Sequence, residues 1–383
     1  MKVTNFLKFL IIMVFVFQSN SYAEDGHEHD HAAHSDEPFY GHVGIRLHAD
    51  HISDANEGDE EVNEVYTHSH IELGSKISKG FNIDTNLKVE GEPGGHAHGG
   101  VRRTHDGESR FFEDHPLIVE SLTLTYKNEN FSAYIGKFNP KVGLDYHSFP
   151  GLYSYSMIEE YKIAERIGGG IKYSADLEDF GTHQLNVSSF FADTTFLSDS
   201  FIDQRGHTSK EDGGLANTEG FDSYAISVGG KDFYSLNNNI AERIFYRLGY
   251  AHQEAAIGNE EDEVRYSISL GYKENFSDRI SKTLIFEYMD IEHYSGEEAH
   301  DRSYFSTSLG LNLHPWSFAT TYTFVDNDAP EEPDENHDGK LLQISIGYSL
   351  SEKLKLDFGF KRTDEEAEVT ERFGLGLKYV FEL

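Results

Sequence analysis

The sequence predicts an all-β fold: a transmembrane, antiparallel, up-and-down β-barrel of about sixteen strands, with long extracellular loops and short periplasmic turns. Three observations predict it. Segments of about ten residues alternate apolar and polar side chains, the breaks between them are often long on one side and short on the other, and the chain begins with an export signal. A period of two with one apolar face is typical of strands whose other face is wet, and about ten residues is the length that a tilted strand needs to cross a bilayer.

Composition narrows the classes of protein to which this chain can belong. The 383 residues include 35 Gly, 28 Phe and 22 Tyr but only 8 Pro, which favours many alternating strands over helices. A formal net charge of −35 argues against nucleic acid as a partner, because such a surface repels a phosphate backbone. Because the chain has no cysteine, disulfide scaffolds, thiolate zinc sites and thiol catalysis are excluded.

Residues 1–23 have the features of a cleaved secretory signal peptide. Lys2 and Lys8 supply the positive start, residues 6–17 are apolar apart from Lys8, and Ser21 and Ala23 are the small residues that a signal peptidase needs. The apolar run is shorter than the ~18 residues that span a bilayer, which disfavours the alternative of a membrane anchor. Residues 24–38 are rich in His, Asp and Glu and are expected to form a disordered tail, and residues 39–383 to form the barrel.

After the tail, the chain repeats one pattern of alternating apolar and polar residues. The pattern is clearest at the C-terminus, where the odd-numbered residues of 373–383 are apolar or aromatic and the even-numbered residues of 372–378 are Arg, Gly or Lys. Strands are expected near 40–51, 64–77, 81–90, 117–127, 131–138, 165–177, 183–192, 221–231, 240–252, 264–274, 280–292, 303–313, 316–325, 340–350, 354–362 and 371–383.

The breaks between these strands differ in length. Short breaks lie at 78–80, 128–130, 314–315 and 351–353, and long ones at 52–63, 91–116, 139–164, 193–220, 253–263, 293–302, 326–339 and 363–370. If both termini are periplasmic, all the long loops fall on the extracellular side. A secreted β-sandwich would also alternate, but it does not explain aromatic residues near the ends of the apolar faces or Gly, Ser and Thr on the other face.

The signal peptide, the strand meander and the aromatic last strand resemble a Gram-negative outer-membrane porin, a family with sixteen strands. Residues 136–140, Gly-Lys-Phe-Asn-Pro, followed by Val142, Gly143 and Leu144, are similar to the segment that opens the third loop of phosphate-selective-type porins. One departure is the last residue: family members usually end in Phe, whereas this chain ends in Leu383 and has Phe381 two residues earlier. The resemblance implies location in the cell outer membrane, outer-membrane lipid and lipopolysaccharide as partners, small polar solutes as cargo, and a homotrimer.

By the same resemblance, loop 139–164 is the candidate constriction, folded into the lumen; the alternative is an ordinary extracellular loop. Strand parity turns several basic side chains inward, Lys273 among them, so that bases on the wall would face acids on the loop. Such a transverse field filters solutes by charge and dipole, unless the bases merely neutralise neighbouring acids. Which charge prevails stays open. The candidate constriction residues are Lys141, Asp145, Glu159, Glu160, Arg166, Lys172, Arg243, Arg247 and Arg265.

Histidine is the second theme of the sequence. Imidazoles beside carboxylates suit borderline divalent ions such as Zn²⁺, Cu²⁺ or Ni²⁺. Their spacing here is not that of a closed zinc site, so we expect weak binding of Zn or Cu and no required cofactor; the alternative is a solvated polar tail. The candidate metal ligands are His27, His29, His31 and His34 in the tail, His96 and His98 in loop 91–116, and His68 and His70, which share one face of a strand with Tyr66 and Glu72.

Sequence motifs of hydrolases, zinc proteases and P-loop proteins do not occur, so the chain is not expected to be an enzyme. The leading hypothesis is a porin: a water-filled outer-membrane channel for passive diffusion of small hydrophilic solutes or ions. The alternative is a His-rich outer-membrane receptor or channel for uptake of a divalent metal or a siderophore-type metal chelate. A structural or adhesive barrel with a plugged lumen is a third hypothesis.

Overall fold

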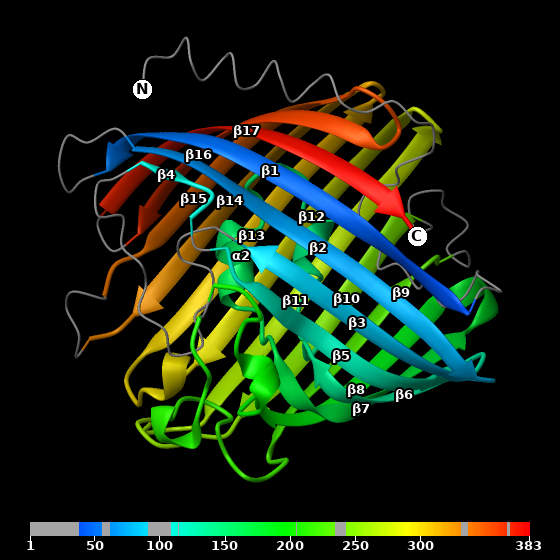
Figure 1. The fold of residues 1–383 in the computed structure, drawn as a ribbon, viewed down its shortest axis with the longest axis vertical. Coiled ribbons are helices and arrows are strands. Elements are labelled where there is room, and N and C mark those ends of the chain that lie inside the picture. Colours follow the sequence, from blue (N-terminus) through cyan, green and yellow to red (C-terminus); the bar gives the residue numbers. More distant parts are fainter. Residues whose placement is uncertain are drawn as a thin grey trace.

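The computed structural model describes residues 38–55, 62–90, 109–113, 115–203, 205–233, 243–330, 336–365 and 368–383. Within these residues, sixteen antiparallel strands close into one barrel (Figure 1), which confirms the predicted fold class. The predicted signal peptide lies outside the described residues, as does the tail apart from Pro38. In the described part of the chain, no helix is both long enough and apolar enough to cross a membrane.

The strands lie close to the predicted ranges. In chain order they are β1 (Phe39–Ala55), β2 (Val62–Ser78), β3 (Phe81–Glu90), β4 (Arg110–Phe111), β5 (Leu117–Lys127), β6 (Phe131–Phe138), β7 (Arg166–Asp176), β8 (Thr182–Ala192), β9 (Ser223–Lys231), β10 (Ile244–Gln253), β11 (Glu263–Ser277), β12 (Ile280–Glu292), β13 (Asp301–Leu313), β14 (Trp316–Asp328), β15 (Gly339–Ser349), β16 (Leu354–Glu365) and β17 (Glu368–Glu382).

Short helices lie between the strands. They are η2 (Tyr146–Ser148), α2 (Ser156–Glu160), η3 (Glu178–Phe180), η4 (Phe196–Ser198), η5 (Lys210–Asp212) and η7 (Tyr294–Gly296). Both η2 and α2 belong to the segment between β6 and β7. This segment is therefore the one whose local structure bears on the predicted constriction.

Each barrel strand pairs with its neighbour in the chain, except that β3 pairs directly with β5; the two-residue β4 pairs in parallel with β2. The last strand, β17, pairs with the first, from His42 opposite Glu382 to Ala55 opposite Thr370. Figure 1 shows β1 in blue beside β17 in red. This closure leaves no long unpaired edge among the barrel strands.

The two faces of the wall differ as the alternation predicts. Large apolar side chains such as Ile135, Ile268 and Phe358 point outward and are more than half exposed. Many inward positions carry small or polar groups, such as Ser306 and Thr323, which are fully buried. An apolar outer belt around a polar interior is the pattern of a barrel that has lipid outside and water inside.

The connections differ between the two ends of the barrel. One end, here the turn end, has the short connections 79–80, 128–130, 278–279 and 314–315, together with the start of β1 and the C-terminus. The other, the loop end, has the longer segments 139–165, 193–222, 254–262 and 293–300. This asymmetry agrees with the predicted division into turns and loops, with one exception. The predicted long loop 363–370 is wrong, because β16 and β17 stay paired as far as Glu365 opposite Glu368.

Candidate functional site

The loop at 139–165 folds into the barrel and crosses its interior. One side is attached to Glu287 of β12, which is 1% exposed. The backbone N–H of Leu144 donates to its carboxylate at 2.7 Å, and the hydroxyl of Tyr161 donates at 2.6 Å. Nearby, Arg265 of β11 donates to the Tyr161 carbonyl at 2.6 Å. A buried carboxylate with several donors is well compensated, so this side of the loop is firmly held.

The loop also reaches the opposite wall. The hydroxyl of Tyr153 donates to Oδ1 of Asp50 on β1 at 2.5 Å, and Asp50 in turn accepts from Arg372 of β17 at 3.0 Å. Gly374 of β17 makes room for this approach, because a Cβ there would lie 1.6 Å from the Tyr153 hydroxyl. The loop therefore spans the lumen from β11–β12 to the β17–β1 junction.

Apolar side chains fill the space between the loop and one part of the wall. Met157 and Ile158 of α2 are each 1% exposed and belong to one cluster with the inward-facing Ile285, Met289 and Leu341. Burying such side chains on both partners stabilises the seated loop by the hydrophobic effect. This apolar packing adds to the polar contacts that hold the loop.

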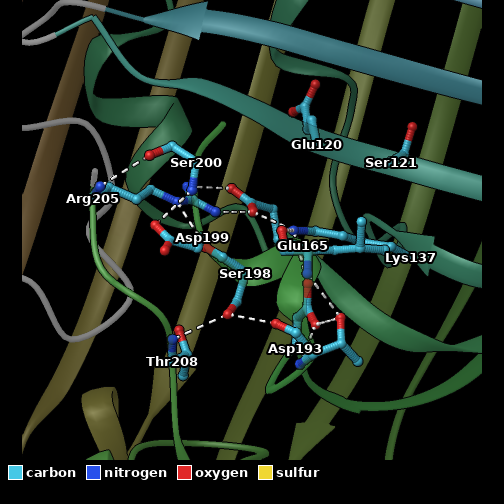
Figure 2. Close-up of polar contacts among 12 residues, drawn as sticks. Glu120, Ser121, Lys137, Glu165, Asp193, Ser198, Asp199, Ser200, Arg205 and Thr208 are labelled. Carbon is cyan, nitrogen blue, oxygen red and sulfur yellow. Dashed lines mark hydrogen bonds and ion pairs between the residues drawn. The ribbon is translucent and has the colours of Figure 1, made fainter. Parts of the chain in front are cut away.

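The base of the loop is anchored by a network of charges in which Arg205 is half-buried and the other three side chains are buried (Figure 2). The Nζ of Lys137, at the end of β6, lies 2.8 Å from Glu165 and 2.9 Å from Asp193. Arg205 forms a two-pronged ion pair with the same Glu165. The four side chains are two cations and two anions, so the network is formally neutral. Because Asp193 and Arg205 follow β8, the network ties the loop base to segment 193–222.

Segment 193–222 also covers part of the wall. Because β6 ends at Phe138 and β7 begins at Arg166, the first half of β5 has no β6 partner. The backbone of Leu117 instead exchanges hydrogen bonds with residues 201 and 202, at 2.8 Å and 3.3 Å. These hydrogen bonds complete the wall at the point where the loop at 139–165 leaves it to enter the lumen.

A cavity of about 550 Å³ remains open beside the loop. It is lined by residues of β1, β2, β3, β5, β6, β7 and β8, by the turn 128–130 and by Lys141 at the start of the loop. Acids and bases occupy different parts of the lining: Glu72 and Asp84 lie on β2 and β3, whereas Lys172 lies on β7 and Lys141 on the loop. The remaining charged lining residues are Lys127 and Glu129.

Of the predicted constriction residues, two line this cavity and two lie elsewhere on or against the loop at 139–165. Lys141 and Lys172 line the cavity, Asp145 is exposed on the loop, and Arg247 donates to the Gly143 carbonyl at 3.3 Å. Burial, together with the charges of Arg247 and Lys172, lowers the pKa of the Lys141 ammonium to about 7. The side chain of Lys141 therefore gains or loses its charge near neutral pH.

The other candidates brace the loop and the wall. Arg166 and Arg265 are buried: Arg166 donates to Gln253 at 2.9 Å, and Arg265 pairs with Glu263 at 2.6 Å. The remaining three contact other strands, with Glu159 pairing with Lys88 at 2.9 Å, Glu160 accepting from Tyr304 at 3.3 Å, and Arg243 pairing with Glu274 at 2.5 Å. Inward parity was right for Arg166 and Arg265. It was wrong for Arg243, whose partner Glu274 shares the outward face of β11 with Ile268, which is 60% exposed. Parity also does not show whether an inward side chain meets water or another residue.

Glu120 is a lumen residue that the sequence did not single out. It accepts from Lys162 at 2.6 Å and from Asn86 at 2.7 Å. The strand pairing shifts there, because Asn86 lies opposite Ser121 and the next residue, Leu87, lies opposite Val119. This bulge interrupts the alternation, so parity alone could not have placed the carboxylate inside.

The predicted metal ligands divide into two groups. His27, His29, His31, His34, His96 and His98 lie outside the described residues. His68 and His70 share one face of β2, as predicted, and the structure turns that face toward the lumen, but they have different surroundings. His68 is 2% exposed and lies 3.7 Å from Glu90, whereas the Nε2 of His70 lies 3.1 Å from the Nε2 of His42 on β1.

No family model matches the sequence. No curated protein sequence matches it either. Solved structures do resemble the fold. The high-pH structure of OprB from Pseudomonas putida aligns over 95% of this chain and 100% of its own, with a TM-score of 0.65 and 8% identity. The outer membrane channel DcaP of Acinetobacter baumannii aligns over 90% and 96%, with a TM-score of 0.53 and 13% identity. At these identities the likeness concerns the fold alone: the chain has the sixteen-stranded barrel fold of Gram-negative outer-membrane porins.

Proposed function

We propose that this protein is an outer-membrane porin that lets small hydrophilic solutes or ions diffuse passively through a water-filled lumen. The observation that carries the proposal is the loop at 139–165, which narrows the barrel and leaves a charged cavity of about 550 Å³ beside it. The apolar outer face supports a place in the membrane, with the turn end toward the periplasm. The resemblance to DcaP, described as an outer membrane channel, supports the same function.

The charges around the cavity suggest how the channel would select solutes. Glu72 and Asp84 place carboxyl groups on one part of the lining, and Lys141 and Lys172 place amino groups on another. A field across the passage orients water and polar solutes, whereas an apolar solute would have to displace that water without compensation. We therefore expect polar or charged solutes to pass more readily than apolar ones of equal size.

Planar-bilayer recording of the purified, detergent-solubilised protein tests this function. Stepwise conductance in potassium chloride is the expected result, and its absence would remove the channel proposal. The variant Lys172→Glu should shift the reversal potential in a salt gradient toward cation preference, because it changes the charge of the cavity lining by two units. The matched control Lys353→Glu makes the same change in the turn 350–353, outside the cavity lining, and should leave the reversal potential as it is.

Uptake of a divalent metal is the second candidate function. It is favoured by the pair of imidazoles formed by His42 and His70, which lies in the lumen beside Glu72. The two candidates are compatible, since a passive channel can hold a metal-binding group along its path. The phosphate-selective resemblance of residues 136–144 and the homotrimer remain predictions.

A further inference from the structure

Three potential metal ligands converge from neighbouring strands on the lumen face. In the pairing of β1 with β2, His42 lies opposite Glu72 and Gly44 lies opposite His70. Since side chains two apart on a strand share a face, His70 and Glu72 point the same way. One ligand atom from each of His42, His70 and Glu72 can be chosen so that all three lie within 4.8 Å of one another.

The separation of the two imidazoles fits a shared metal ion. Their Nε2 atoms are 3.1 Å apart. Two nitrogens bound to one tetrahedral Zn²⁺ at ordinary bond lengths are separated by ~3.3 Å, so the rings need move only slightly to bind together. Oε2 of Glu72 lies 3.6 Å from Nδ1, the other ring nitrogen of His42. One carboxylate oxygen of Glu72 also lies within 4.8 Å of a ring nitrogen of each histidine, so it is near enough to join them as a ligand.

Gly44 leaves room for the imidazole ring of His70. A Cβ at residue 44 would lie 2.3 Å from Cε1 and 2.5 Å from Nε2 of His70. A residue with any side chain would therefore have to push the imidazole away from His42. The cluster thus includes a glycine that lets the second ring lie against the backbone of β1, in addition to three ligand-type side chains.

The cluster is open to solutes in the channel. Glu72 lines the cavity of about 550 Å³, and its side chain is 39% exposed, while that of His42 is 10% exposed. His147, which is exposed on the loop at 139–165, has its ring centre 6.3 Å from that of His70. A hydrated ion in the lumen would reach the carboxylate first and the imidazoles next.

We propose that His42, His70 and Glu72 form a binding site for a borderline divalent metal ion, of the class of Zn²⁺, Ni²⁺ or Cu²⁺, in the wall of the channel. Two imidazoles and one carboxylate suit these ions better than they suit Mg²⁺ or Ca²⁺, which prefer oxygen ligands. Three protein ligands leave a further coordination position for water. An open site of this kind can release its ion again, and passage through a channel requires such release. The proposal rests on the channel function, because the ion must reach the site through the lumen.

Zn²⁺ serves as the probe, and the mature full-length protein serves as the sample. The first readout is the open-channel current in a planar bilayer during Zn²⁺ addition, and the second is a calorimetric Zn²⁺ titration in detergent. His70→Ala removes a ligand. His252→Ala is the matched control, because His252 of β10 also lies beside a carboxylate, Asp262 at 3.2 Å, but outside the cluster. Both variants lose one histidine, so histidines elsewhere in the chain affect them equally.

Zn²⁺ should reduce the current through the wild type and through His252→Ala at the same concentration. His70→Ala should need at least about tenfold more Zn²⁺, and its titration should lose about one bound equivalent relative to the control. Gly44→Ala should weaken the Zn²⁺ effect as well, although it keeps all three ligands. Heat-modifiable gel mobility like that of the wild type will show that the variants are folded.

The outcomes separate this proposal from the channel function on which it rests. Stepwise conductance that Zn²⁺ affects equally in the wild type, His70→Ala and His252→Ala would overturn the metal site and leave the channel standing. Absence of conductance from the wild type would overturn the channel, and with it the role in transit. In that case a difference between the two titrations would still assign the ion to this cluster.

Discussion

Replacing Glu287 by alanine should release one side of the loop at 139–165 and widen the channel. The carboxylate accepts from the Leu144 N–H at 2.7 Å and from the Tyr161 hydroxyl at 2.6 Å, so it holds both arms of the loop. Hydrogen bonds to a charged group contribute about 1.5–3 kcal/mol each, which gives a loss of about 3–6 kcal/mol of loop attachment. Removing a buried charge offsets part of this loss. The change acts on the loop rather than on the strand pairing.

Single-channel recording is the assay for this prediction. Glu287→Ala should raise both the mean conductance and the current noise, because a partly detached loop fluctuates in the passage. Glu287→Gln keeps the shape and one acceptor oxygen, so its effect should be smaller. Glu274→Ala is the matched control, because Glu274 of β11 pairs with Arg243 and does not hold the loop at Leu144 or Tyr161. Wild-type conductance and noise in a folded Glu287→Ala protein would refute the reasoning that this carboxylate holds the loop.

Three further predictions follow from the same structure. Because the pKa of Lys141 is lowered to about 7, its side chain is charged below that pH and neutral above it. Anion preference in reversal-potential measurements should therefore fall as the pH rises from about 6 to about 8. Lys141→Arg, which stays charged, should flatten this dependence. Lys137→Met leaves Glu165 and Asp193 without a buried cation that contacts both, and should destabilise the folded barrel by about 3–5 kcal/mol; an unchanged thermal midpoint by circular dichroism would contradict this. If the homotrimer implied by the porin resemblance forms, the unboiled protein should run as a heavy band that boiling converts to monomer, and a fast-migrating monomer in unboiled samples would contradict it.

The wall of the barrel could be predicted from the sequence because side-chain alternation is a local property of a strand. Each predicted strand overlaps an observed one, and the predicted inward side of β7 and β11, with Arg166 and Arg265, was right. The bulge at Glu120 shows where this reasoning fails, since one extra residue in the pairing places a side chain against the pattern.

The contents of the lumen could not be predicted in the same way, because they depend on contacts between residues far apart in the chain. His42 lay within a predicted strand, but its place opposite Glu72 follows only from the register of β1 with β2. Likewise, His68 and His70 share a face, yet only His70 reaches His42, because His68 is buried near Glu90. Similarly, Glu287 and its loop partner Leu144 are 143 residues apart along the chain.

The contacts of Asp50 make seating of the loop depend on closure of the barrel. This carboxylate accepts from Tyr66 on the adjacent strand, from Tyr153 on the loop and from Arg372, which is 322 residues further along the chain. Arg372 arrives only when the last strand pairs with the first. Until then, Asp50 lacks its nearest cation and Gly374 does not yet flank the Tyr153 hydroxyl. A chain whose final strand has not docked would therefore lack part of the seat for its loop, so narrowing of the passage belongs to the last stage of assembly.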